Sequence, residues 1–119
     1  MKSVRIALLS VIAIGLIFSY TFAAGDAEKG KSLFNDPKFA GGTKACNECH
    51  PGGRGLEKSG MKKEFNMGGK KQLGLEEAVN YCIVKANKGE AIDPKSEDMA
   101  NIIAYIKSLK AEMPKRRGY

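Results

Sequence analysis

The sequence predicts a small all-α domain of three to five helices. Residues 75–86 and 96–109 place apolar side chains three and four positions apart, as on one face of a helix. No segment sustains the two-residue alternation of apolar and polar side chains that a half-buried strand shows. Glycine-rich stretches separate the helical segments, and a chain of 119 residues leaves room for one domain.

Residues 1–24 predict a secretory signal peptide, and residues 25–119 form the predicted domain. Lys2 and Arg5 give a positive start, residues 6–24 are uncharged, and Ala23 offers a small residue for cleavage. The uncharged stretch is 19 residues long, so it would just span a bilayer if it were retained as an anchor. We therefore expect export to the periplasm, with attachment to the membrane only if this segment is kept.

The expected helices have recognisable ends. Asp26 is a suitable N-cap for a short helix that stops at Asn35, and residues 55–69 are expected to be irregular and basic. Gly89 is the expected C-cap of the helix over residues 75–86. Ser96 caps the last helix, whose predicted buried stripe consists of Met99, Ile102, Ile103, Ile106 and Leu109.

One motif carries chemistry: Cys46-Asn47-Glu48-Cys49-His50 has the C-x-x-C-H pattern of c-type haem attachment. Two thiols separated by two residues reach the two vinyl groups of one porphyrin, and the next residue offers its imidazole to the iron. The sequence thus predicts one haem c, bonded to Cys46 and Cys49, with His50 as axial ligand. We expect a backbone carbonyl in the turn that follows, residues 51–54, to accept a hydrogen bond from Nδ1 of His50.

Other uses of these cysteines are less consistent with the sequence. A thioredoxin-like dithiol needs a βαβ context that is absent here. A zinc site would draw on Cys46, Cys49, His50 and Cys82, but adjacent ligands at 49 and 50 strain a tetrahedral site. A disulfide between Cys46 and Cys49 leaves Cys82 unpaired in an oxidising compartment.

The sequence resembles the class I, monohaem cytochromes c. Gly30 and Phe34 are similar to the glycine–aromatic pair of that family's first helix, and Tyr105 and Leu109 to the partner positions in its last helix. The resemblance implies a small cytochrome c fold, with the first and last helices crossing beside one covalently attached haem. Residues 75–82 and 96–99 also resemble the haem domains of Sox-type, thiosulfate-oxidising cytochromes.

The sequence contains several candidates for the sixth ligand of the iron. The usual loop position for a ligating methionine, residues 85–90, contains none. The Sox-type resemblance implies Cys82, and Met99 is the next candidate, followed by Met67 and Met61. Asn87 or an open position remains a further alternative.

These features predict a periplasmic one-electron carrier with no catalytic residues. The alternatives are a haem subunit involved in the oxidation of reduced sulfur and a haem sensor of small ligands. The formal charge of +7 falls to +5 without Lys2 and Arg5, which favours redox partner proteins with acidic docking faces. An exported chain without a binding motif gives no reason to expect a nucleic acid partner.

Overall fold

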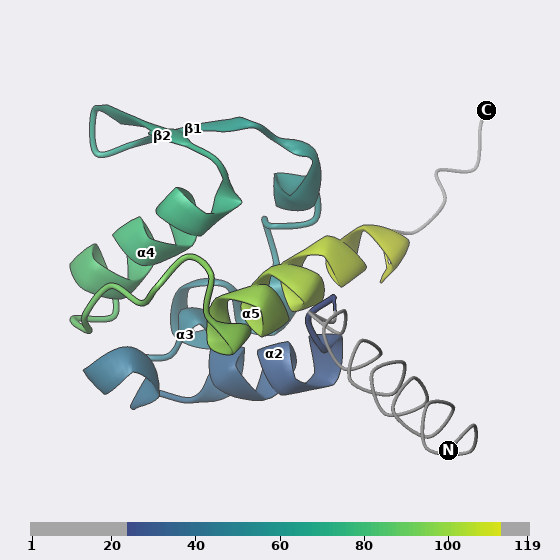
Figure 1. The fold of residues 1–119 in the computed structure, drawn as a ribbon, viewed down its shortest axis with the longest axis horizontal. Coiled ribbons are helices and arrows are strands. Elements are labelled where there is room, and N and C mark those ends of the chain that lie inside the picture. The colour runs from purple at the N-terminus through teal and green to yellow at the C-terminus, as the bar shows by residue number, and fades with distance from the viewer. Residues whose placement is uncertain (1–23, 113–119) are drawn as a thin grey trace, which may run out of the picture.

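The structure is a computed structural model that describes residues 24–112. These residues form four α-helices, several short 3-10 helices and one two-stranded antiparallel sheet (Figure 1). The α-helices are α2 (Ala27–Asn35), α3 (Cys46–Cys49), α4 (Leu75–Lys85) and α5 (Glu97–Ser108). The strands are β1 (Glu64–Met67) and β2 (Lys70–Leu73), and the 3-10 helices are η2 (Phe39–Gly41), η3 (Pro51–Gly53), η4 (Ser59–Met61) and η5 (Leu109–Glu112).

The predicted signal peptide falls almost wholly on residues 1–23, which lie outside the described residues, so it stays a prediction. Within residues 24–112, no helix combines the length and the hydrophobicity that crossing a bilayer requires.

The prediction of an all-α fold is wrong, because the end of the segment expected to be irregular forms β1, which pairs with β2 directly after it in a hairpin. Glu64 and Asn66 are exposed while Phe65 and Met67 are half-buried, so β1 does alternate, but over four residues only. Gly68 and Gly69 have φ of 58° and 75°, which is the backbone of a two-residue turn whose twist suits a hairpin. The fold is therefore small and mixed, although largely helical.

The first and last described α-helices pack closely together, and α5 runs across α2 in Figure 1. Gly30 faces α5 so closely that a Cβ there would collide with the backbone carbonyl of Asn101. One turn later, the rings of Phe34 and Tyr105 meet edge to face, with centroids 5.1 Å apart. Glycine at position 30 thus permits the approach that the aromatic pair then fills.

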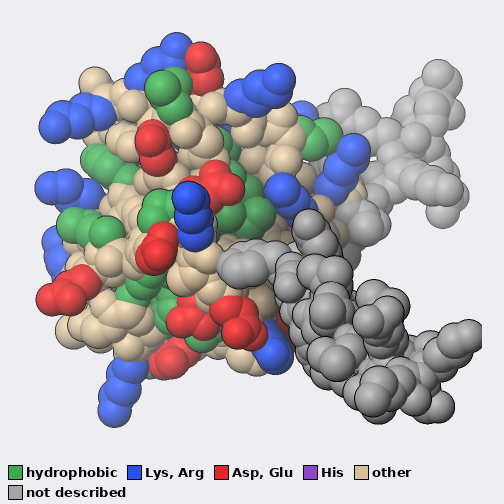
Figure 2. All heavy atoms as spheres, viewed as in Figure 1, with side chains coloured by type: hydrophobic (Ala, Val, Ile, Leu, Met, Phe, Trp, Pro, Cys, Tyr) green, Lys and Arg blue, Asp and Glu red, His purple; other side chains and the backbone are tan. Residues whose placement is uncertain are grey.

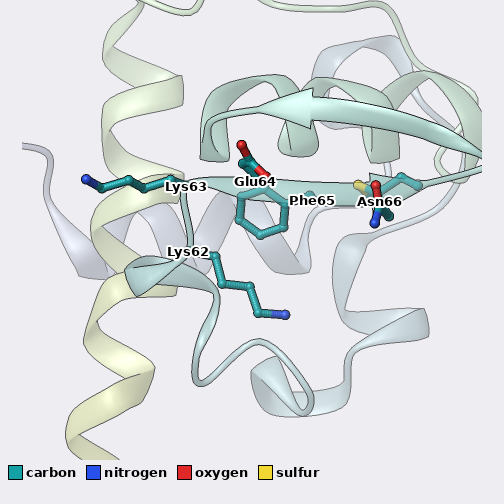
Figure 3. Close-up of a pocket in the computed structure, with 6 residues that line it drawn as sticks. Lys62, Lys63, Glu64, Phe65 and Asn66 are labelled. Atoms are coloured by element: carbon teal, nitrogen blue, oxygen red, sulfur yellow. The ribbon is translucent and has the colours of Figure 1, made fainter.

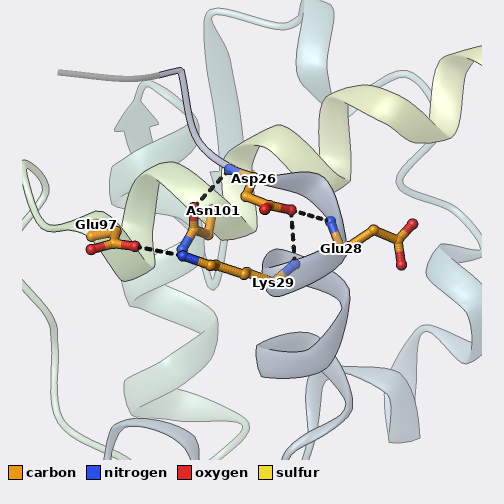
Figure 4. Close-up of polar contacts among 5 residues, drawn as sticks. All are labelled: Asp26, Glu28, Lys29, Glu97 and Asn101. Carbon is orange, nitrogen blue, oxygen red and sulfur yellow. Dashed lines mark hydrogen bonds and ion pairs between the residues drawn. The ribbon is translucent and has the colours of Figure 1, made fainter. Parts of the chain in front are cut away.

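Polar contacts fix the start of α2 on α5 (Figure 4). The carboxylate of Asp26 accepts hydrogen bonds from the amides of Glu28 and Lys29, at 2.9 and 3.1 Å, which confirms Asp26 as N-cap. The Asp26 amide donates to Oδ1 of buried Asn101 at 2.7 Å, and Lys29 Nζ lies 3.2 Å from the Glu97 carboxylate. The last two residues are exposed, so the buried amide contact contributes more than the ion pair.

The end of α4 differs from the prediction. The helix ends at Lys85, Ala86 is its C-cap, and Lys88 rather than Gly89 has positive φ, at 61°. Gly89 donates its amide to the Ile83 carbonyl at 2.9 Å. A Cβ on Gly89 would stand 2.8 Å from the Ala40 carbonyl oxygen. Glycine is therefore needed here for a close approach of two backbones, not for a left-handed cap.

The main core lies between α4 and α5. Every residue of the stripe predicted for the last helix is buried, and Met99 is fully enclosed. On α4 the predicted face is buried at four positions, Leu75, Ala78, Val79 and Ile83, whereas Cys82 is half-buried and Ala86 is exposed. The half-buried position of Cys82 places it at the edge of the core, next to the cavity described below.

Candidate functional site

An apolar cavity of about 160 Å³ lies beside the C-x-x-C-H motif. Its wall comes from α3, the segment after it, the hairpin, α4 and α5, together with one ring from α2. The lining residues are Phe34, Cys46, His50, Leu56, Ser59, Phe65, Met67, Leu75, Ala78, Val79, Cys82, Ile102 and Ile106. Five of these side chains carry a nitrogen, oxygen or sulfur atom: Cys46, His50, Ser59, Met67 and Cys82.

Helix α3 brings two residues of the motif to the cavity. The His50 amide donates to the Cys46 carbonyl at 3.0 Å, so the two residues are one helical turn apart and lie on the same side. Cys49 is exposed and does not line the cavity, although it belongs to the same single turn. The motif thus presents one thiol and one imidazole inward, with the second thiol at the surface.

The turn after the motif fixes the His50 ring. His50 Nδ1 lies 3.0 Å from the Arg54 carbonyl oxygen, which confirms the predicted backbone acceptor. Gly52 and Gly53 have φ of 61° and 81°, and Asn47 Oδ1 accepts a hydrogen bond from the Gly52 amide at 2.8 Å. With the proton on Nδ1 donated to Arg54, Nε2 has a free lone pair, which is the arrangement that a metal-binding histidine requires.

Asn87 holds the first thiol of the motif. It is 4% exposed, and its side-chain Nδ2 donates to Cys46 Sγ at 3.2 Å, while its backbone carbonyl accepts from the Thr43 amide at 2.9 Å. Burial raises the pKa of the Cys46 thiol, and the hydrogen bond from Asn87 opposes this in part. No pattern in the sequence predicts this contact, because the two residues are 41 positions apart. The sequence suggests Asn87 only as a candidate iron ligand.

Only some of the candidates for the sixth ligand lie on the cavity wall. Cys82 and Met67 line the cavity together with His50. Met99 is fully buried in the core and Met61 is 53% exposed, and neither lines the cavity. Burial raises the pKa of the Cys82 thiol, and the nearby Cys46 and Cys49 raise it further, so the free thiol is protonated at neutral pH.

A second, shallow hollow runs along β1 and is lined by residues 62–67 (Figure 3). In Figure 3 the Phe65 ring and the Glu64 carboxylate lie on opposite sides of the strand. Phe65 and Met67 line both this hollow and the apolar cavity, so the hairpin is the wall between the cavity and solvent. Phe65 is not among the site residues that the sequence predicts. The pattern that points to it is the alternation over residues 64–67, next to Gly68-Gly69.

The residues present fit a haem in their chemistry. Imidazole, thiol and thioether groups are the usual axial ligands and attachment points of haem iron, and the remaining lining is almost entirely apolar. The enclosed volume is below the about 300–1,000 Å³ typical of ligand pockets, so the enclosed part of the cavity alone would not hold a porphyrin. Among residues 24–112 no three His, Cys, Asp or Glu side chains cluster as a metal site requires, which leaves the zinc alternative without a ligand set.

A mostly helical domain that presents C-x-x-C-H beside an apolar cavity defines a c-type cytochrome. The family model of the SoxA/TsdA cytochrome c domain matches residues 29–114, and the chain belongs to this family. Membership implies a covalently bound c-type haem and a role in electron transfer. No curated protein and no solved structure matched the chain.

Proposed function

We propose that the protein is a periplasmic one-electron carrier with a single c-type haem, attached to Cys46 and Cys49 and ligated by His50. The observation that supports this most directly is the position of His50, on the wall of an apolar cavity with Nδ1 bonded to Arg54. A single C-x-x-C-H motif in the sequence supports one haem rather than two. The N-terminal segment supports export.

In this proposal the haem supplies one iron that alternates between the ferric and ferrous states. Each residue of the site has a positioning or insulating task. The Arg54 carbonyl holds the imidazole of His50 in one tautomer and orientation. The apolar side chains of α4 and α5 that line the cavity would keep water from a bound haem and so tune its potential, and no residue would need to act as acid or base.

We propose Cys82 as the sixth ligand, since it is one of the two sulfur candidates on the cavity wall. It is held on α4, a helix of eleven residues packed on the core, whereas Met67 belongs to the exposed hairpin. A thiolate ligand donates electron density and lowers the potential relative to a thioether. The same residue supports a second candidate function, a haem subunit in the oxidation of reduced sulfur, because Cys82 matches the cysteine ligand of the Sox-type domains that the sequence resembles.

The test is to produce the full chain together with an intact haem-attachment system and to measure its mass and spectrum. We expect the mass of the processed polypeptide plus one haem, and loss of covalent haem in the Cys46→Ala, Cys49→Ala double variant. A colourless product without added mass would refute the proposal. Recovery of the protein in the periplasmic fraction, with a new N-terminus near residue 24, tests the location.

The ligand and the enzymatic alternative need separate measurements. Cys82→Ser should change the low-spin spectrum of the ferric protein, and Met67→Leu should leave it unchanged; the reverse result assigns Met67. Turnover of thiosulfate by the holoprotein would favour the enzymatic candidate. Reversible reduction without such turnover favours the carrier.

A further inference from the structure

Positive charge is concentrated in one segment of the described chain. Residues 54–71 contain six Lys and Arg and two Glu, a net charge of +4. All other residues from 24 to 112 contain nine Lys and Arg and eleven Asp and Glu, a net charge of −2. The segment includes η4, β1 and the start of β2, so this stretch of chain is basic while the rest of the described chain is slightly acidic.

The basic side chains of this segment are available to a partner. Lys62, Lys63, Lys70 and Lys71 are all exposed. Within residues 24–112 only Lys71 among them forms an ion pair, with Glu64 at 2.8 Å. Figure 2 shows basic side chains projecting at the end of the molecule where Figure 1 places the hairpin. Charges without an internal partner keep their field toward solvent, where it attracts groups of opposite sign.

Exposed apolar side chains lie among these lysines. Met61 is 53% and Leu73 is 64% exposed, which makes them the two most exposed of the large apolar side chains in the described part of the chain. Leu73 lines a surface hollow of about 350 Å³ together with Lys62, Lys63 and Lys107. An apolar centre with a charged rim is the anatomy of a protein-binding surface, and encounters between redox proteins use small ones.

The same segment is the wall of the haem cavity. Phe65 and Met67 line the cavity, whereas the neighbouring Lys63 and Glu64 are exposed. A partner on the outer face of the hairpin would therefore be separated from the cavity by one strand and its side chains.

We propose that residues 58–73 form the docking face for a redox protein whose own cofactor is surrounded by acidic side chains. This inference rests on the proposed carrier function, because it names the surface through which that carrier exchanges electrons. Complementary charge steers such partners together and raises the rate of association without requiring a tight complex. The competing explanation is that these lysines only neutralise the propionate groups of the haem.

The test measures the second-order rate of reduction of the ferric holoprotein by a reduced flavodoxin, an acidic redox protein, in a stopped-flow instrument. We compare Lys62→Gln, Lys63→Gln with the charge-matched control Lys31→Gln, Lys38→Gln, whose exposed lysines lie on α2 and just after it. At low ionic strength we expect the hairpin variant to be about tenfold slower and the control to stay within twofold of the wild type. The difference should vanish at high salt, because screening removes the steering.

Three outcomes would overturn the docking face. Equal slowing of both variants would show that only total charge matters. A changed reduction potential in the hairpin variant, sufficient to explain its slower rate, would assign the lysines to the propionates. A rate that neither variant alters would place docking elsewhere.

Leu73→Ser adds a readout that does not depend on charge. Its side chain is mostly exposed, so folding should be unaffected, and we expect slower reduction at high salt as well as at low salt. An unchanged rate would remove the apolar centre from the docking face. If instead the wild-type chain carries no haem and dithionite produces no ferrous spectrum, the carrier function itself fails, which is a result distinct from all of these.

Discussion

The α2–α5 helix pair and the β1–β2 hairpin border the same cavity but are stabilised in different ways. The helix pair is held by buried contacts: the backbone approach at Gly30, the ring pair of Phe34 and Tyr105, and the amide of Asn101. The hairpin is mostly exposed, with half-buried Phe65 and Met67 inside and an ion pair outside. The comparison indicates that the helix pair stabilises the fold, while the hairpin covers the cavity and its outer face contributes little to stability.

The largest effect should come from Gly30→Val. The added side chain meets the Asn101 backbone carbonyl, which cannot move without displacing α5, so we expect a loss above about 5 kcal/mol and little folded holoprotein. Thermal unfolding followed by far-UV circular dichroism measures it. The matched control is Gly69→Ala in the hairpin turn, where nothing lies near the new Cβ and only the positive φ of 75° costs energy, about 1–2 kcal/mol. Equal losses in both variants would erase the distinction between the two regions.

Phe34→Ala should be the next most damaging change. The ring is 2% exposed, packs on Tyr105 and also lines the cavity, and removal of such a ring costs about 3–5 kcal/mol. Urea unfolding of the holoprotein gives the free energy, and Phe34→Leu, which keeps most of the volume, should lose much less. A loss below about 1 kcal/mol for the alanine variant would mean that the aromatic pair is not part of the core.

The difference between the regions also explains what the sequence predicted. Helices α2, α4 and α5 and the core stripe from Met99 to Leu109 were predictable, because capping residues and a 3.6-residue apolar period extend over about ten consecutive residues. The hairpin was not, since a four-residue strand gives only two alternations and Gly68-Gly69 alone is compatible with any loop. Whether a short segment forms a strand depends on the residues that it packs against, and a single sequence does not show which residues these are.

The site, like the fold, has features that the sequence predicts and features that it does not. The roles proposed for Cys46, Cys49 and His50 rest on local spacing, and the Arg54 carbonyl lies only four residues beyond His50. The contact between Asn87 and Cys46 depends on where α4 ends against α3, and no local pattern encodes it. The gathering of Cys82 and Met67 on one wall, with Met99 behind it in the core, is likewise a result of tertiary packing.

Asn87→Ala tests this junction between the motif and α4. Loss of the buried amide removes a hydrogen bond to Cys46 Sγ and leaves a cavity, with an expected cost of about 1–3 kcal/mol. We also expect a larger fraction of chains with a free Cys46 thiol, detected by alkylation and mass spectrometry of the peptide that contains it. The control is Asn101→Ala, which removes an equally buried amide from the helix pair and should lower stability without freeing Cys46. A free Cys46 in both variants would show that attachment follows overall stability, not the Asn87 contact.

Lys71→Gln should have the smallest effect, and it tests how much the outer ion pair stabilises the hairpin. Lys71 Nζ and the Glu64 carboxylate lie 2.8 Å apart, but their side chains are 55% and 58% exposed, so water screens the pair and a coupling of about 0.2–1 kcal/mol is expected. A double-mutant cycle with Glu64→Gln, measured by urea unfolding at low and high salt, gives this coupling directly. A coupling above about 2 kcal/mol would mean that the hairpin is held as firmly by its outer charges as α2 is by its buried contacts. The outer face would then be constrained by stability, and its lysines would no longer be free to serve a partner.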